Sequence, residues 1–182
     1  MADLTRPRLL LHVCCGPCST AVIERLRPDY DVTLFWHNPN LEPAEEHERR
    51  LEAARQVAEA LGVELTIVGG GEAEFAALCQ GREELPEGGE RCRLCYELRL
   101  RATCEHAAAH GHDLVATTLT ISPHKPAAVV NETGQRVAAE HGVSFLAAEF
   151  KQRTGFQRSL QMSRDLGLYR QTYCGCRWSR RP

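Results

Sequence analysis

The chain has 182 residues, nine cysteines and a formal net charge of −2. This length is typical of one domain with its own core, and no apolar run approaches the ~20 residues that a membrane-spanning helix needs. No signal-peptide core precedes the first apolar segment, so we expect a cytoplasmic protein whose reduced thiols are metal ligands or redox groups rather than disulfides.

The first predicted element is a buried strand in the apolar run from Leu9 to Val13, which breaks at Gly16-Pro17. Ser19 and Thr20 are expected to cap the helix that follows. The rest of the pattern predicts strand 31–36, helix 43–61, strand 63–68, a helix through 75–78, helix 92–111, strand 113–118, a helix up to 142, strand 143–146 and a helix at 155–170. This alternation indicates an α/β fold with a parallel sheet and helices on both faces.

Basic residues gather at one end of the chain. Residues 151–182 hold eight basic residues and one acidic residue, a local charge of +7, whereas residues 1–150 have a charge of −9. We expect one α/β domain over 1–182 with a basic helical extension at about 150–182. An acidic body with a basic tail favours an anionic partner, although a solvated helix face gives the same charge pattern.

Seven of the nine cysteines fall in three short groups: Cys14-Cys15-Gly16-Pro17-Cys18, Cys92-Arg93-Leu94-Cys95 and Cys174-Gly175-Cys176. The first group follows a predicted strand, at the edge of an α/β sheet where ligands bind. The second opens a predicted helix, whose amino terminus stabilises thiolates. Seven thiols exceed the four ligands of a tetrahedral zinc ion and favour an iron–sulfur cluster. The isolated Cys79 and Cys104 are interpreted as small buried hydrophobes.

The sequence leaves open how the seven thiols divide. In one division Cys14, Cys15, Cys92 and Cys95 hold the metal, while Cys174 and Cys176 form a redox pair. A disulfide across one residue closes a strained ring that is readily reduced. In the other division, Cys18 or Cys176 helps to hold a separate iron.

Five segments in this order resemble the cobalamin-independent epoxyqueuosine reductases, and the resemblance covers nearly the whole chain. The segments are His12-Val13-Cys14-Cys15-Gly16-Pro17-Cys18, Asn38-Pro39-Asn40, Glu87 to Leu100, Thr117 to Lys125, and Gly167 to Cys176. One departure is Gly16, because the family usually has Ala after the cysteine pair.

The resemblance implies an oxidoreductase of tRNA queuosine biosynthesis. Its reaction is the two-electron removal of the epoxide oxygen of epoxyqueuosine at the tRNA wobble position, which gives queuosine. It also implies a Rossmann-like nucleotide-hydrolase (HUP) fold, a [4Fe–4S] cluster near Cys14, Cys15, Cys92 and Cys95, and no cobalamin. A redox role for Cys174 and Cys176, or a second iron nearby, is implied as well. The electron donor stays unidentified.

A tRNA substrate gives the basic residues a role. Lys125 follows the predicted fourth strand, and we expect it to contact the nucleotide together with four residues of the tail: Lys151, Arg153, Arg158 and Arg177. Phosphate contacts of this kind weaken as salt rises and read little sequence. A splayed anticodon-loop base can stack on an aromatic ring, and Tyr96, Tyr169, Tyr173 and Trp178 are the candidates.

Two other functions remain open from the residues. One is an ATP-dependent tRNA-modifying enzyme of the same fold, but the first strand lacks the Ser-Gly-Gly loop that such an enzyme uses for pyrophosphate. The other is a zinc-stabilised binding module without chemistry. Colour separates this module from an iron–sulfur protein, because a zinc protein is colourless.

Overall fold

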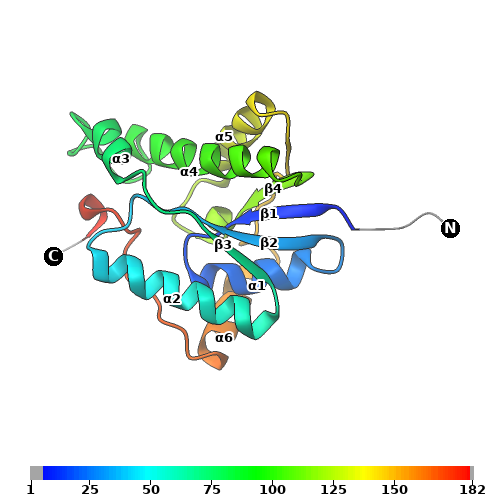
Figure 1. The fold of residues 1–182 in the computed structure, drawn as a ribbon. Helices are drawn as coiled ribbons and strands as arrows, with labels where there is room; N and C mark the ends of the chain where they lie inside the picture. The colour runs from blue at the N-terminus through cyan, green and yellow to red at the C-terminus, as the bar shows by residue number, and fades with distance from the viewer. Residues whose placement is uncertain (1–5, 181–182) are drawn as a thin grey trace.

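A computed structural model describes residues 6–180 and contains one five-stranded parallel sheet. The strand order is β3-β2-β1-β4-β5, so the chain starts in the middle of the sheet and fills each side in turn (Figure 1). The strands are β1 (Arg8–His12), β2 (Asp31–Trp36), β3 (Glu64–Ile67), β4 (Leu114–Thr117) and β5 (Ser144–Phe145). The predicted parallel α/β sheet is confirmed.

Helices cover both faces of this sheet (Figure 1). One layer consists of α1 (Gly16–Leu26), α2 (Ala44–Leu61) and α6 (Gly155–Asp165), and the other of α3 (Glu72–Cys79), α4 (Glu90–Ala109) and α5 (Ala127–Glu140). Two short 3-10 helices are η1 (Thr118–Ile121) and η2 (Arg177–Ser179). In the described part of the chain, no helix has the length and apolar character to cross a membrane.

The central strand β1 shows why the sheet is buried on both faces. Successive side chains of a strand point to opposite faces. Leu9 and Leu11 therefore pack in the core on the α1 and α2 side, while Leu10 packs on the other side with Val115 and Val137. All three leucines are fully buried. An unbroken apolar run thus places β1 between two helical layers.

The start of α1 differs from the prediction. The helix begins at Gly16, and its N-cap is Cys15, whose sulfur accepts a hydrogen bond from the Cys18 amide at 3.3 Å. The predicted caps, Ser19 and Thr20, lie inside the helix and donate their hydroxyls to backbone oxygens one turn earlier. Proline suits the first helical turn, so Pro17 allows the helix to start before Ser19.

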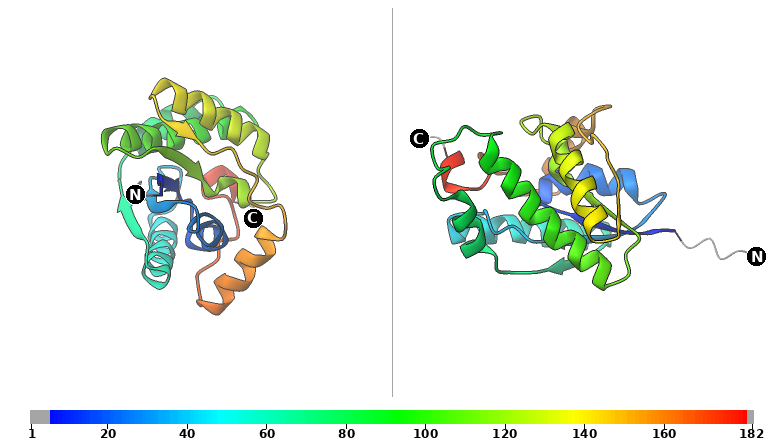
Figure 2. Two further views of the ribbon diagram at one scale, coloured as in Figure 1. Left: turned by 90° about the vertical axis from the view of Figure 1, so that its right-hand side faces the viewer. Right: turned by 90° about the horizontal axis from the view of Figure 1, so that it is seen from above.

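The tail is less helical than predicted. Helix α6 ends at Asp165 rather than at residue 170, because Gly167 adopts a left-handed conformation (φ 62°) and the Leu168 amide donates back to the Ser163 oxygen at 2.9 Å. The chain then runs without helix or strand to η2. This segment lies between α2 and α4 (Figure 2). Arg181, one of the eight basic tail residues, lies outside the described residues.

Candidate metal and substrate site

A cavity of about 830 Å³ opens at the carboxyl edge of the sheet. The loops after β1 and β4 supply one side of it, and the segment after α6 supplies the other. Its lining includes three thiols, five cationic side chains and two polar residues of the tail, namely Cys14, Cys18, Cys174, Arg50, Arg99, Lys125, Arg170, Arg180, Gln171 and Tyr173. The site therefore lies where the ends of parallel strands and the starts of helices predict a ligand.

Cys14, Cys15 and Cys18 form a thiol triad, whose sulfur atoms all lie within 4.8 Å of one another. Hydrogen-bond donors surround these sulfurs. The Gln171 amide lies 3.0 Å from the Cys15 sulfur, and the Thr118 hydroxyl lies 3.5 Å from the Cys14 sulfur. Cysteine sulfur with N–H and O–H donors around it is the environment of an iron–sulfur cluster. The triad therefore fits such a group.

The three thiols of the triad ionise unequally. Hydrogen bonds with Cys15 and Cys18 lower the pKa of Cys14 well below its usual range. Burial raises the pKa of Cys15 to about 12, and the bonds of the Cys18 thiol to its two neighbours raise the pKa of Cys18. Ligating thiols are deprotonated, so a bound cation is needed to ionise Cys15 and Cys18.

The other two cysteine groups meet close to the triad. Cys92 and Cys95 lie in the first two turns of α4, and Cys95 packs with Cys176 in one apolar cluster. Cys14 packs against the cluster that contains Cys92. Burial raises the pKa of Cys95 to about 12, and the nearby thiols of Cys174 and Cys176 also raise it. All three cysteine groups thus lie at one edge of the sheet. Cys18 belongs to the triad.

The predicted cluster ligands Cys14, Cys15, Cys92 and Cys95 are not all part of the triad, and this four-thiolate set stays a prediction. Cys79 and Cys104 are buried, as their interpretation as small hydrophobes requires. Cys104 packs in the core beneath α4 and α5, whereas Cys79 packs beside Cys95 and Cys176.

The two tail cysteines occupy different places. Cys174 is half-buried and lines the cavity, whereas Cys176 is 7% exposed and packs away from it against Phe75. Cys174 is the member of the pair that is open to the cavity. The predicted redox pair therefore has one thiol at the cavity and one behind it.

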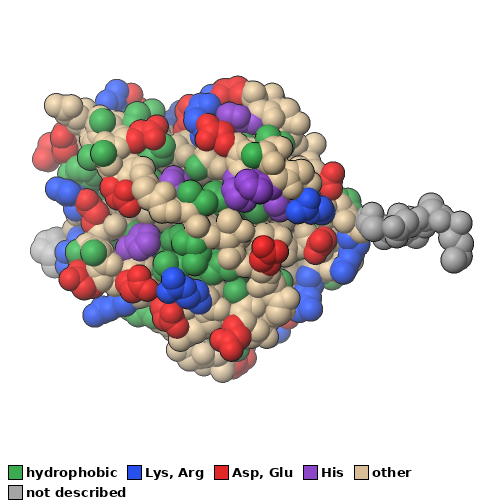
Figure 3. All heavy atoms as spheres, viewed as in Figure 1, with side chains coloured by type: hydrophobic (Ala, Val, Ile, Leu, Met, Phe, Trp, Pro, Cys, Tyr) green, Lys and Arg blue, Asp and Glu red, His purple; other side chains and the backbone are tan. Residues whose placement is uncertain are grey.

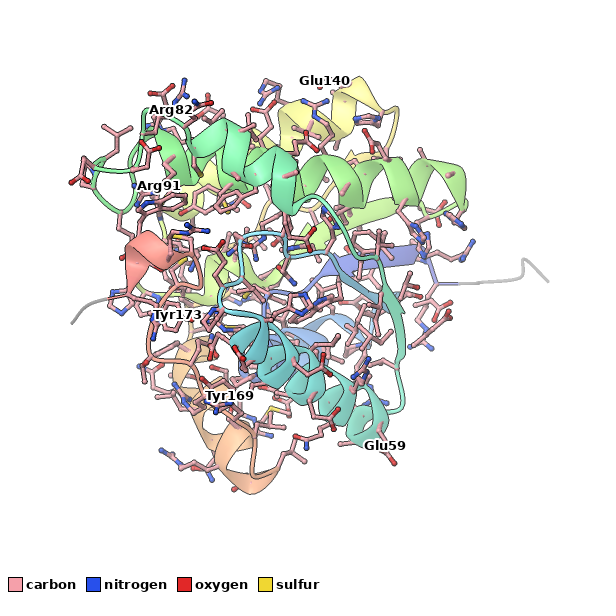
Figure 4. The ribbon with its side chains drawn as sticks, turned by 60° about the vertical axis from the view of Figure 1, so that its left-hand side comes forward. Glu59, Arg82, Arg91, Glu140, Tyr169 and Tyr173 are labelled. Carbon is pink, nitrogen blue, oxygen red and sulfur yellow. The ribbon has the colours of Figure 1, made fainter. Side chains whose placement is uncertain are left out.

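A buried ion pair on α2 holds this tail segment. The Arg50 guanidinium donates to the Tyr173 oxygen at 3.0 Å and to the Cys174 oxygen at 2.9 Å, and its Nε lies 2.6 Å from Glu46. Glu46 also accepts from the Tyr169 hydroxyl at 2.6 Å. Figure 4 shows Tyr169 and Tyr173 on the tail segment beside α2. Arg50 thus fixes the backbone of Cys174 at the cavity.

Of the five predicted phosphate-binding residues, Lys125 and Lys151 are neighbours, and only Lys125 lines the cavity. Lys125 lines the cavity, and although burial lowers its pKa, the nearby Cys174 and Cys14 thiols raise that pKa above its usual value. Lys151 contacts Glu149 at 3.3 Å and the Lys125 oxygen at 3.2 Å. Arg153 is exposed. Lys125 therefore shares the lining of the cavity with Cys14 and Cys174.

Three of the four predicted tail cations are already paired, and Lys151 with Glu149 is one of these pairs. Arg158 bonds to both carboxylate oxygens of Glu24, and Arg177 bonds to both of Glu42. The cavity has instead Arg170 and Arg180, which sequence reasoning left unassigned. Elsewhere, the face in Figure 3 mixes acidic and basic side chains. The tail cations that face the cavity, Arg170 and Arg180, therefore differ from the four that were expected to contact phosphate.

His12 at the end of β1 is buried and neutral. Burial lowers the pKa of His12 to about 3, and the nearby Arg99 charge lowers it as well. Its Nδ1 lies 2.9 Å from the Thr117 hydroxyl at the end of the neighbouring strand. His12 thus joins the ends of β1 and β4 beneath the triad.

The family model described as "Epoxyqueuosine reductase QueH" matches residues 9–182. The chain belongs to this family. The epoxyqueuosine reductase QueH of Streptococcus pyogenes serotype M1 is 38% identical over 180 residues, which cover 96% of this chain and 71% of that protein. QueH of Thermotoga maritima is 32% identical over 177 residues, which cover 94% of this chain and 89% of that protein. The predicted family and its oxidoreductase activity are confirmed.

Two solved structures share the fold with this QueH chain. U34-tRNA thiolase NcsA from Methanococcus maripaludis, described with its [4Fe-4S] cluster, aligns with a TM-score of 0.61 at 14% identity over 97% of this chain and 62% of that chain. A predicted subunit of tRNA methyltransferase from Methanocaldococcus jannaschii aligns with a TM-score of 0.56 at 12% identity over 84% of this chain and 76% of that chain. They confirm the predicted HUP-type α/β fold.

Proposed function

We propose that the thiol-lined cavity removes the epoxide oxygen of epoxyqueuosine at the wobble position of a tRNA, with a [4Fe–4S] cluster held by cysteine thiolates. The single observation that carries this proposal is the triad of Cys14, Cys15 and Cys18, whose sulfurs lie within 4.8 Å of one another beside a cavity of about 830 Å³. The cluster named for the fold neighbour NcsA supports it. All nine cysteines are free thiols and are available as ligands or redox groups.

The reaction needs two electrons and two protons, and it releases water as the epoxide becomes an alkene. A cluster of this kind supplies electrons, and its potential depends on the charge and hydrogen bonds around the sulfurs. Cys174 and Cys176 can supply the same total as a dithiol, because their conversion to a disulfide releases two electrons and two protons. Cys174 lines the cavity and is the thiol nearer to the substrate. An electron donor then reduces the pair again.

A separate iron is the alternative to the dithiol. Cys18 or Cys176 is the residue expected to help hold it, and Cys18 belongs to the triad while Cys176 lies in the apolar cluster with Phe75. We favour the dithiol because Cys174 lines the cavity. Lys125 keeps its proposed role at the substrate nucleotide, because its ammonium lies at the cavity beside Cys174.

The test of this function is an anaerobic analysis of iron and sulfide, together with turnover. The wild type is expected to be brown and to hold about four irons and four sulfides per chain. Cys14→Ala is expected to lose the cluster and turnover, because it removes a triad sulfur. Cys104→Ala is the matched control and is expected to keep the cluster and turnover, since Cys104 lies in the core away from the cavity. A colourless wild type with stoichiometric zinc contradicts the proposal and favours the zinc-stabilised module.

We propose that tRNA phosphate meets Arg170 and Arg180 at the cavity. Among residues 6–180 neither arginine has a carboxylate partner, in contrast to Arg158 and Arg177. Arg180 lies 5.7 Å above the Tyr173 ring, which offers a stacking surface at the same place. An unpaired cation attracts phosphate more strongly than a neutralised one.

The double variant Arg170→Ala/Arg180→Ala is expected to weaken tRNA binding and to reduce its salt dependence. Each phosphate contact to single-stranded nucleic acid contributes about 0.7 to the slope of log affinity against log salt, so the slope should fall by about 1.4. Titrations of tRNA binding at a series of salt concentrations measure this slope. Arg158→Ala, which removes a paired cation, should leave the slope unchanged. A smaller slope for Arg158→Ala together with an unchanged slope for the double variant contradicts this assignment.

A further inference from the structure

Arg99 is a buried cation in the middle of α4, between the cysteine groups. Its side chain is 2% exposed. One guanidinium nitrogen donates to the Asn38 side-chain oxygen at 2.7 Å, and another lies 3.8 Å from the Cys95 sulfur. Its Nε has no hydrogen-bond partner within the described residues. Arg99 also lines the cavity beside Cys14 and Cys174.

No carboxylate forms an ion pair with Arg99 within residues 6–180. Arg50, which is equally buried, is paired with Glu46 at 2.6 Å. Burying a charge without a partner costs several kcal/mol, so an anion is expected beside Arg99. The potential anions around it are the thiols of Cys95, Cys14 and Cys174, which raise the pKa of Arg99 although burial lowers it.

The position of this charge is fixed. Asn38 accepts from Arg99 through its oxygen and donates through its nitrogen to the Val13 oxygen at 2.9 Å. Val13 directly precedes Cys14, so the Arg99–Asn38 pair connects the loop that carries the triad to the helix that carries Cys92 and Cys95. The guanidinium therefore cannot move toward solvent without breaking this connection.

We propose that Arg99 is the fixed counter-charge of the thiolate-bound group and raises its reduction potential. This inference rests on the proposed function. A positive charge next to the sulfurs stabilises the reduced, more negative state of an iron–sulfur group, and net charge and hydrogen bonds to sulfur are known determinants of its potential. Arg99 acts through the sulfurs, so it is a positioning and tuning residue rather than a catalytic one.

A charge series at residue 99 tests the inference. Arg99→Met removes the charge at similar length, and Arg99→Lys keeps it. Arg101→Met is the matched control on the same helix, because Arg101 is one-third exposed and pairs with Glu97 and Glu140. Spectroelectrochemical titration of the loaded proteins should give a more negative potential for Arg99→Met alone.

Several results overturn the inference. One is a loaded Arg99→Met protein with the wild-type potential, and another is an Arg99→Lys protein whose potential falls as far as that of Arg99→Met. If Arg99→Met folds but takes up no iron while Arg99→Lys does, the need for the charge is supported. If both variants fold and neither takes up iron, the shape of the guanidinium matters rather than its charge. Iron analysis of the wild type separates these results from failure of the proposed function, because a wild type without iron overturns both.

Discussion

Arg50→Met is expected to lower turnover by about 100-fold and the free energy of unfolding by about 3–5 kcal/mol. Arg50 is 2% exposed and joins α2 to the backbone of Tyr173 and Cys174. Methionine fills much of the same volume but leaves the Glu46 carboxylate buried without its cation. It also releases the tail segment, so Cys174 is no longer held at the cavity. Urea unfolding and a turnover assay measure the two effects.

Arg55→Met on the same helix is the control for this prediction. Arg55 is 46% exposed and pairs with Glu48 at 3.1 Å and with Glu52 at 3.6 Å. Surface pairs of this kind contribute about 0–1 kcal/mol, and Arg55 does not touch the tail. The proposed anchoring role is wrong if Arg50→Met and Arg55→Met unfold alike and turn over alike.

Gly16→Ala is expected to destabilise the protein by about 1–3 kcal/mol and to reduce the iron bound per chain. A Cβ at residue 16 would lie 2.4 Å from the Ala53 backbone oxygen, so α1 and α2 cannot keep their present separation. Cys15 and Cys18 lie on either side of this contact in the first turn of α1, and a shift of the turn moves their sulfurs. The close approach of Ala53 gives Gly16 in this chain a physical reason.

Gly69→Ala is the control for this second prediction. A Cβ at residue 69 meets nothing within 4 Å, and the residue has no positive φ. Its stability should be unchanged or raised by up to about 1 kcal/mol, because alanine restricts the unfolded chain. Thermal unfolding and iron analysis apply to both variants. A Gly16→Ala protein with wild-type stability and iron content shows that α2 moves aside without cost.

The sheet and the position of the site follow from local patterns in the sequence. Leu9, Leu10 and Leu11 form an unbroken apolar run, and only a strand covered on both faces buries all three. Since parallel strands end at one edge, cysteines placed after a strand and at the start of a helix are expected to converge there. This pattern predicts that Cys14 and Cys92 lie at one edge of the sheet. Cys174 follows no strand, and tertiary contacts such as the hydrogen bond from Arg50 bring it there.

The partners of individual charges were beyond prediction because they are set by tertiary contacts. Arg158 lies 134 residues from Glu24 in the sequence, and Arg50 lies 124 residues from Cys174. The i,i+4 spacing of Glu46 and Arg50 indicates a helical ion pair, but such pairs are common on exposed faces. Only the position of the tail segment shows that the Glu46–Arg50 pair is buried and holds Cys174 at the cavity. Arg99 likewise has no local signal that separates it from the partly exposed Arg101.

Cys15 joins the metal site to the helical scaffold through a single atom. Its sulfur belongs to the triad and also accepts the Cys18 amide at the start of α1. A thiolate accepts a hydrogen bond more strongly than a neutral thiol. The hydrogen bond from the Cys18 amide to Cys15 at the start of α1 is therefore expected to be stronger when Cys15 is a metal-bound thiolate. Because α6 packs against α1, we expect a metal bound at the triad to stabilise the base of the tail segment as well.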